Sequence, residues 1–345
     1  MGGREHDEGD PVPPDGTSLP PDGEDAAGAP PEGRATGAGE LLARALDDLE
    51  AGVRARLAET RPAGDGTDWL ALFDELRERL RTLGMTEHAA RVDDFGLDPE
   101  ALARARPLLD LLATRWWRLE VEGAPPAGAG PVLYVGNRSG LLPWDGLMIA
   151  HHVAGVRGEP ARPRFLVADW LVTLPFAQPV LAQLGGVRAC RENAERLLRT
   201  GRSVVAFPEG VKGAAKVFRQ RYRLQRFGRG GVVRVALATG APLVPVAVVG
   251  AEEVHPILFK VTTMARTVGL PFVPVTPTFP WLGPLGLVPL PSHWHIRFGE
   301  PLDTAGLPPE AAEDELLVSR LTEELRSAVQ AMVDAERRRR PGIFA

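Results

Sequence analysis

Residues 131–146 place Arg138 and Asp145, two side chains able to act on charged or titrating groups, within one short segment. A β-branched and aromatic run at 132–135 predicts a buried strand. The Gly, Asn, Ser and Pro residues after it predict a loop, and an apolar helix is expected from about Asp145. A carboxylate can accept a proton or orient a neighbour, whereas a guanidinium stays protonated at any accessible pH. Arg138 itself therefore cannot serve as a base.

A second segment, GGVRACRENAERLL at 185–198, places Arg191 at the predicted start of a helix. A guanidinium suits phosphate because its planar fork donates to two phosphate oxygens at once. We therefore predict that Arg191 holds a phosphate group, with Arg188 as the alternate. The other interpretation is that both arginines simply flank the start of a helix.

A third segment, SVVAFPEG at 203–210, runs a predicted strand directly into Glu209. The carboxylate then lies at the carboxyl end of a strand, where α/β sheets bind ligands. A fourth segment, GAPLVPVAVVG at 240–250, reads as a buried strand interrupted by Pro245. An ordinary core strand with a proline at the sheet edge fits this fourth segment equally well.

Taken together and in this order, the four segments resemble the glycerolipid acyltransferase superfamily over about residues 118–300. The resemblance implies an enzyme that moves a fatty acyl group from acyl-CoA or acyl carrier protein to a lysophospholipid or glycerol phosphate. It implies no metal and no cofactor beyond the acyl thioester, and an acyl channel shaped by the fourth segment. Two groups of residues follow from it: the reacting centre holds Asp145, Arg138 and Glu209, and the substrate contacts Arg191 or Arg188, Phe207, Pro208, Gly210 and Lys212.

Arg138 stands where the family has a histidine, and six residues rather than four separate it from Asp145. In the family, this histidine takes the proton of the acceptor hydroxyl and the Asp orients it. Loss of a general base slows a reaction by roughly 10²–10⁴-fold. Three hypotheses follow: Asp145 or Glu209 becomes the base after burial raises its pKa, another histidine fills the position, or the chain is a lipid-binding pseudoenzyme in which Arg138 grips phosphate. The histidines considered are His151 and His152, and less favourably His255, His293 and His295.

The alternation of apolar patterns predicts an α/β fold, a mixed and mostly parallel sheet flanked by helices. We expect a disordered acidic tail at 1–39, a helical N-terminal region at 40–117 that caps the main domain, and an α/β domain at 118–345 that ends in a long helix. The predicted strands are 118–122, 131–136, 164–168, 186–190, 203–207, 243–249 and 294–298. The predicted helices are 40–59, 68–84, 98–117, 144–154, 170–183, 192–200, 229–239 and 309–338.

Charge is distributed unevenly along the chain, whose net charge is −5. Residues 1–40 carry ten acidic residues and two arginines, with few large apolar residues, which predicts disorder and excludes a signal peptide. Residues 188–234 instead hold thirteen Arg or Lys against three Glu. No nucleic-acid module frames this basic stretch, so a phosphate-bearing lipid or coenzyme A is the better partner. The lone Cys190 excludes an intramolecular disulfide and fits a reducing cytoplasm.

Two segments at 170–187 and 267–296 carry no charged residue apart from histidines. Prolines interrupt both, which argues against a transmembrane helix. They are either core with irregular connections, an apolar surface that rests on a bilayer, or a surface that binds a protein partner. The abundance of Ala, Gly and Pro predicts a bacterial source. We also expect a cytoplasmic protein that contacts the inner face of the plasma membrane peripherally and binds no nucleic acid.

Overall fold

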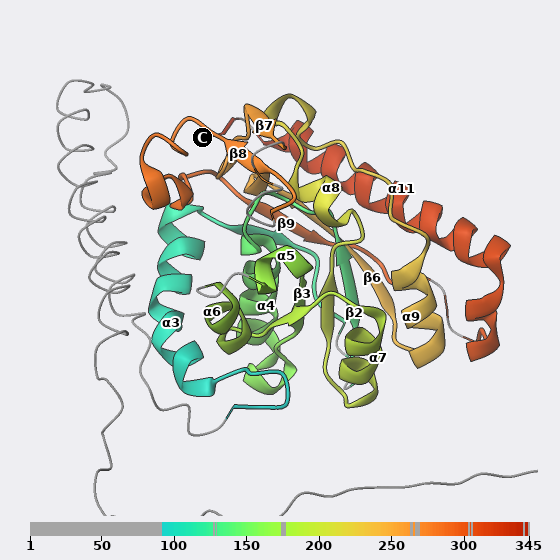
Figure 1. The fold of residues 1–345 in the computed structure, drawn as a ribbon. Coiled ribbons are helices and arrows are strands. Elements are labelled where there is room, and N and C mark those ends of the chain that lie inside the picture. Colours follow the sequence, from blue (N-terminus) through green and yellow to red (C-terminus); the bar gives the residue numbers. More distant parts are fainter. Residues whose placement is uncertain are drawn as a thin grey trace, which may run out of the picture.

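The computed structural model describes residues 92–126, 128, 130–173, 177–262, 265, 270–302, 304, 306–340 and 342–343. The expected tail at 1–39 and the expected helices at 40–59 and 68–84 lie outside the described residues. The described part of the chain folds into a seven-stranded sheet with helices against both faces (Figure 1). The predicted α/β class, with a mixed and mostly parallel sheet, is confirmed.

All seven predicted strands are present in the large sheet, each within two residues of its predicted limits. Their order across the sheet is β1-β9-β6-β2-β5-β3-β4. Neighbouring strands run parallel except β6 and β9, which are antiparallel. The strands are β1 (Glu120–Glu122), β2 (Leu133–Gly136), β3 (Arg164–Val167), β4 (Gly186–Arg188), β5 (Val204–Ala206), β6 (Leu243–Val249) and β9 (His295–Phe298).

Two short strands, β7 (Phe259–Val261) and β8 (Val273–Val275), form a separate antiparallel pair that the sequence did not predict. They are three residues long, too short for an alternating pattern to identify them. Both lie within a proline-rich part of the chain that follows β6, drawn near the C-terminal end of the described chain in Figure 1.

Pro245 lies in β6, which is an interior strand between β2 and β9, so the interpretation as an edge proline is wrong. Proline is tolerated there because the ladder to β9 begins at Val246. The amide that proline lacks therefore falls outside that ladder. All seven residues of β6 are buried, which is why the strand reads as one apolar run.

The described helices follow the prediction with four differences, one of which is that the C-terminal α-helix begins at Glu315 and not at residue 309. The expected helix at 170–183 is two short helices, with Pro175 between them in the sequence; the expected helix at 98–117 ends in a π-helical turn at Leu112–Trp116; and α8 was not predicted. The C-terminal helix starts at Glu315, where the Asp314 side chain accepts hydrogen bonds from the first backbone N–H groups. The α-helices are α3 (Pro99–Leu111), α4 (Trp144–Arg157), α5 (Asp169–Val172), α6 (Ala177–Gln183), α7 (Arg191–Arg199), α8 (Gly210–Ala214), α9 (Gly231–Thr239) and α11 (Glu315–Arg339).

Side chains of β2 alternate between two cores, as a strand buried on both faces requires. Tyr134 packs with α3 and α4 on one face of the sheet, and Leu133 and Val135 pack with α7, α9 and α11 on the other (Figure 1). Among the described residues, no helix combines the length and apolar content that crossing a bilayer would require. The loops at the carboxyl ends of β2, β5 and β6 meet at one edge of the sheet, and the candidate site lies there.

Candidate active site

Asn137 fixes the loop that follows β2. Its side-chain nitrogen Nδ2 donates to the carbonyl oxygen of Val248 at 2.8 Å, and its Oδ1 accepts from the backbone N–H of Val248 at 2.8 Å. Asn137 is fully buried, and each of these bonds replaces one that water would otherwise supply. The Asn of the first segment therefore ties the loop to the neighbouring strand β6 and holds the next residue, Arg138, at the sheet edge.

Arg138 and Asp145 form a buried ion pair. The Nη1 atom of Arg138 lies 2.6 Å from Oδ1 of Asp145, and both side chains are at least nine-tenths buried. Asp145 also accepts from the backbone N–H groups of Ser139 and Gly146, both at 2.8 Å, and from the Ser139 hydroxyl at 3.1 Å. Burial raises the pKa of Asp145, while Arg138 and these donors act in the opposite direction. The Asp145 carboxylate therefore accepts hydrogen bonds from Arg138, Ser139 and Gly146, and its contact with Arg138 orients the guanidinium.

Glu209 braces the same loop from the carboxyl end of β5. Its Oε1 accepts from the backbone N–H of Arg138 at 2.8 Å, and its Oε2 accepts from the backbone N–H of Gln225 at 2.6 Å. The Nζ atom of Lys216 lies 3.3 Å from that second oxygen. Both oxygens of this buried carboxylate are therefore engaged, and the side chain positions two backbone segments beside β5.

Lys216 extends the buried network toward β6, and sequence reasoning missed it. Its Nζ atom lies 2.7 Å from Oε1 of Glu252, whose Oε2 accepts from the backbone N–H of Tyr222 at 3.0 Å. Burial raises the pKa of Glu252 to about 7, although Lys216 opposes the shift. Burial lowers the pKa of Lys216, but the two carboxylates Glu252 and Glu209 outweigh it and raise that pKa. A single cation thus stabilises two buried acids.

A cavity of about 330 Å³ opens next to this network, within the range of small-molecule pockets of about 300–1,000 Å³. Its apolar wall comes from β2, β3, β5 and α9, with Leu133, Leu166, Ala206, Val232 and Val235 among the lining residues. Arg138, Arg191 and Arg229 also line it. The arrangement therefore combines an apolar interior with three cationic side chains from three different segments.

The cavity brings together five of the residues predicted from sequence: Arg138, Arg191, Phe207, Pro208 and Gly210. The guanidinium carbon of Arg138 lies 5.3 Å from the centroid of the Phe207 ring, a cation–π distance. Arg229 was not predicted as an individual residue, although it lies in the basic stretch that the sequence singled out.

Four predicted residues are not among those lining the cavity. Asp145 and Glu209 are buried, and their side chains contact Arg138 and its loop. Arg188 is exposed and pairs with Asp169 through two contacts of 2.9 and 3.1 Å. Lys212 is exposed on α8. Of the two arginines proposed for phosphate, the geometry therefore favours Arg191.

The described histidines are all held away from Asp145. His151 pairs with Asp110 at 2.9 Å, His152 stacks on Phe298, and His255 contacts the carbonyl oxygen of Leu287 at 2.7 Å. His293 and His295 both face Glu120. The hypothesis that one of these five histidines fills the position of Arg138 is therefore wrong. His6 and His88 lie outside the described residues.

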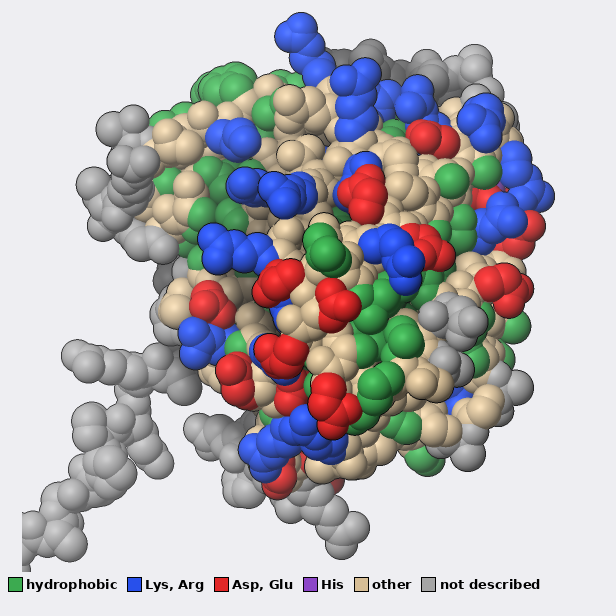
Figure 2. Space-filling view, turned by 90° about the vertical axis from the view of Figure 1, so that its right-hand side faces the viewer, with side chains coloured by type: hydrophobic (Ala, Val, Ile, Leu, Met, Phe, Trp, Pro, Cys, Tyr) green, Lys and Arg blue, Asp and Glu red, His purple; other side chains and the backbone are tan. Residues whose placement is uncertain are grey.

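The surface over α7, α9 and α11 is not uniform in charge. In Figure 2, which turns the right-hand side of Figure 1 toward the viewer, basic side chains predominate in the upper part and acidic ones in the lower part. The upper part is the level at which α8 lies in Figure 1, at the carboxyl edge of the sheet. A basic rim on this edge favours an anionic ligand over a cationic one.

One family model and several related proteins match this chain. The family model named acyltransferase matches residues 118–249. An uncharacterised protein of Mycobacterium tuberculosis is 45% identical over 243 residues, which cover 69% of this chain and 67% of the relative. An uncharacterised protein of Mycobacterium leprae is 44% identical over 241 residues, covering 69% and 66% of the two chains. The match thus spans about two thirds of the length of these relatives.

Two more distant similarities were found. A chloroplastic phytyl ester synthase of Arabidopsis thaliana is 27% identical over 241 residues, which cover 62% of this chain and 33% of that protein. The crystal structure of the 1-acyl-sn-glycerophosphate acyltransferase of Thermotoga maritima is similar over 76% of this chain and 88% of that one, with 17% identity and a TM-score of 0.43.

Proposed function

This chain belongs to the acyltransferase family, and from that premise we propose that it moves a fatty acyl group from a coenzyme A or acyl-carrier-protein thioester to a hydroxyl of a lysophospholipid or glycerol phosphate. The acyl thioester is the co-substrate, and the proposal needs no further cofactor. The observation that supports it most is the apolar cavity lined by Arg138, Arg191 and Arg229 at the carboxyl edge of the sheet.

Arg191 is suited to exchange its protein partner for a phosphate. Its side chain is 46% exposed, and its Nε donates to Glu195 on the same helix at 2.6 Å. An exposed ion pair of this kind contributes at most about 1 kcal/mol. The guanidinium can therefore turn toward a ligand phosphate at little cost and donate to two of its oxygens. Arg229 offers a second cation at the cavity.

Arg138 takes a different part in the proposed reaction, because it cannot remove a proton. The acceptor hydroxyl oxygen bonds to the thioester carbonyl carbon, the carbon–sulfur bond breaks, and the hydroxyl proton ends on the departing thiol. Negative charge develops on the carbonyl oxygen, and a fixed cation lining the cavity stabilises it. Asp145 and Glu209 then act as positioning residues, since one orients the Arg138 guanidinium and the other its backbone.

The proposal includes peripheral contact with the inner, cytoplasmic face of the plasma membrane. Four large apolar side chains in or near β7 and β8 are exposed: Leu258, Phe259, Trp281 and Leu282. Trp281 is the most open of them, at 73%. Two of the four lie in the uncharged segment 267–296 that the sequence singled out. Exposed aromatic and aliphatic groups near a basic rim are suited to an anionic bilayer surface.

A second candidate function is a lipid-binding protein that keeps the cavity but does not turn over. The observation in its favour is that both oxygens of Glu209 and both oxygens of Asp145 are engaged by donors. Neither carboxylate lines the cavity, and among the described residues no histidine pairs with either of them. This alternative predicts binding of lysolipid without product.

The test uses purified protein, labelled acyl-CoA or acyl carrier protein, and a panel of acceptors that includes lysophospholipids, glycerol phosphate and a long-chain isoprenoid alcohol. We expect product with a phosphate-bearing acceptor, and at least about tenfold less from Arg191→Ala, because a charge-assisted pair of hydrogen bonds is lost. Arg196→Ala is the matched control, since Arg196 lies on the same helix and forms a similar exposed pair with Asp94.

Three outcomes would change the assignment. A larger loss of product in Arg188→Ala than in Arg191→Ala would mean that Arg188, and not Arg191, binds the phosphate. Lysolipid binding without product in the parent, with product from Arg138→His, would favour the binding protein. Product only with the isoprenoid alcohol would replace the phosphate-bearing acceptor. Co-sedimentation with anionic liposomes, compared between the parent and Trp281→Ser, checks the membrane contact separately.

A further inference from the structure

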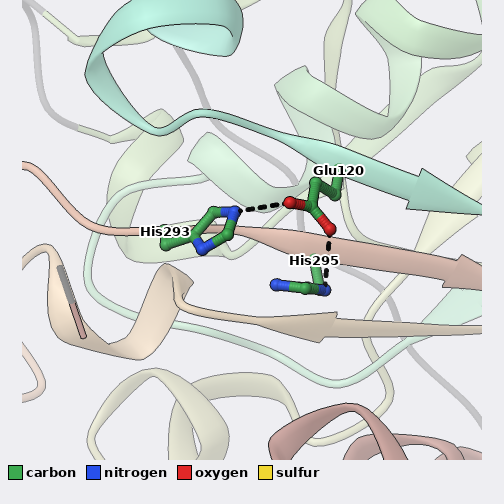
Figure 3. A group of neighbouring side chains, drawn as sticks. All are labelled: Glu120, His293 and His295. Atoms are coloured by element: carbon green, nitrogen blue, oxygen red, sulfur yellow. Dashed lines mark hydrogen bonds and ion pairs between the residues drawn. The ribbon is translucent and has the colours of Figure 1, made fainter. Parts of the chain in front are cut away.

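Glu120 on β1, His295 on β9 and His293, two residues before His295, come together (Figure 3), and none of the three lines the cavity. The two histidines are two residues apart in extended chain, so their side chains point to the same face of the sheet. Glu120 is the parallel-register partner of His295, and its backbone N–H donates to the carbonyl oxygen of Trp294 at 2.9 Å. The backbone itself therefore directs two imidazoles and one carboxylate to one place.

The three side chains are close enough to share an ion. The Nε2 atom of His293 lies 3.0 Å from Oε1 of Glu120, and the Nδ1 atom of His295 lies 3.8 Å from its Oε2. One ligand atom from each residue lies within 4.8 Å of the others. Zinc binds imidazole nitrogen and carboxylate oxygen at about 2.0–2.2 Å, so its ligands lie about 3.4 Å apart. Small side-chain rotations therefore suffice to close a coordination sphere.

Other charged groups face the His295 ring, among them Glu120, Glu336 and Arg340. The Oε2 atom of Glu336, on α11, lies 3.7 Å from the Nδ1 atom of His295.

We propose that Glu120, His293 and His295 bind a divalent transition-metal ion of the zinc class, with Glu336 or water in the remaining position. Two imidazoles and a carboxylate form a donor set that zinc accepts. The site is formed by β1, β9 and the residues just before β9, and β6 separates β9 from β2 and the cavity. The ion would therefore link the edge of the sheet to α11 and take no part in acyl transfer. This inference is independent of the proposed function.

The experiment uses untagged full-length protein, so that no added histidines compete for metal. Bound zinc is counted by elemental analysis after dialysis, and affinity is measured by titration against a chromophoric chelator. Cobalt(II) loading adds a coordination spectrum. The variants are His293→Ala, His295→Ala and Glu120→Gln. His151→Ala is the matched control, because His151 also pairs with one carboxylate, Asp110, at 2.9 Å.

We expect one zinc ion per chain in the parent and in His151→Ala. Removal of either imidazole from the site is expected to weaken zinc binding on the order of 100-fold, with a smaller loss in Glu120→Gln. Thermal unfolding in chelator checks that each variant still folds, and zinc raises the Tm of the parent and of His151→Ala only. The proposal is overturned if the parent takes up less than about half an equivalent, or if His295→Ala and His151→Ala bind zinc equally well.

Discussion

Arg138 and Arg191 both line the cavity, but the loop after β2 and the start of α7 hold their guanidinium groups in opposite ways. Arg138 is 6% exposed, and its partner Asp145 is fully buried at 2.6 Å. The Arg191 side chain is 46% exposed, and its partner Glu195 is at 2.6 Å on the same helix. The two ion pairs have the same contact distance and differ in their access to water.

That difference decides what each arginine can do. In a buried pair, loss of one partner leaves an uncompensated charge in a poorly polarisable environment. In an exposed pair, water and salt replace the missing partner. Arg138 is therefore part of the folded structure and supplies a fixed charge, whereas Arg191 can change partners when a ligand arrives. The proposed function depends on this distinction. Four measurements test the contrast between the two arginines and the buried network around Arg138.

The largest effect is expected from Asp145→Ala. The substitution leaves the Arg138 guanidinium buried without its counter-ion, and removal of one partner of a buried pair lowers the free energy of unfolding by about 3–5 kcal/mol. Glu195→Ala is the comparison, with an expected loss of at most about 1 kcal/mol. Urea unfolding of both variants measures the difference. Equal losses would mean that burial does not separate the two regions.

Gly213→Ala tests the packing behind Arg138. A Cβ atom there would lie 2.6 Å from Cβ of Glu209 and 2.8 Å from Cβ of Arg138. Such overpacking is expected to lower the free energy of unfolding by about 1–3 kcal/mol. Gly155→Ala in α4 is the control, because no heavy atom lies within 4 Å of its added Cβ. The control should gain about 0.5–1 kcal/mol from helix propensity. A neutral Gly213→Ala would show that the loop can shift.

The pH dependence of stability tests whether the buried network is charged. Burial raises the pKa of Glu252 from 4.5 to about 7, so between these pH values the folded state keeps a proton that the unfolded state has lost. The free energy of unfolding therefore falls as pH rises from about 5 to about 7, by up to about 1.4 kcal/mol per pH unit.

His255 opposes this trend, and a variant is needed to separate the two. Burial lowers the pKa of His255 from 6.5 to about 4, so its contribution makes stability rise between pH 4 and 6.5. We therefore expect the free energy of unfolding to rise more steeply with pH between about 5 and 7 in Glu252→Gln than in the parent. Urea unfolding at several pH values measures both. Parallel profiles would contradict the raised pKa of Glu252.

The sequence predicted the elements of the site better than its contacts. The resemblance placed Arg191, Phe207, Pro208 and Gly210 among the substrate contacts, and they line one cavity because the carboxyl ends of parallel strands meet at one edge of the sheet. The pairing of Lys216 with Glu252 did not follow, since 36 residues separate them and neither lies in a strand. No spacing rule connects a residue after α8 with one after β6.

The Glu120, His293 and His295 group could not be predicted for a related reason. Glu120 and His293 are 173 residues apart, and they meet because β1 pairs with β9. That pairing depends on the strand order, which periodicity does not determine. For Arg138 the sequence predicted the position but not the contacts. Its position in the loop was clear from the sequence, but the engagement of both Asp145 and Glu209 by donors became visible only in three dimensions.

The smallest expected effect on stability is that of Arg191→Ala, and its value lies in the contrast with ligand binding. Exposure predicts a change in the free energy of unfolding of at most about 1 kcal/mol. Affinity for a phosphate-bearing acceptor should nevertheless fall at least about tenfold, because the planar fork is lost. Arg191→Lys separates charge from geometry, since an ammonium keeps the charge without the two parallel donors. Its affinity should fall between those of the parent and Arg191→Ala.

Calorimetric titration at two salt concentrations measures these affinities, and salt should weaken the contact in the parent because the charge is exposed. A loss of stability in Arg191→Ala as large as that in Asp145→Ala would mean that Arg191 is also a structural part of the fold. Unchanged affinity in both Arg191 variants would mean that the phosphate binds Arg229 or Arg138 instead. In that case the cation that binds the ligand would belong to a different segment, and binding at Arg138, which is buried, would mean that exposure does not identify the ligand-binding cation.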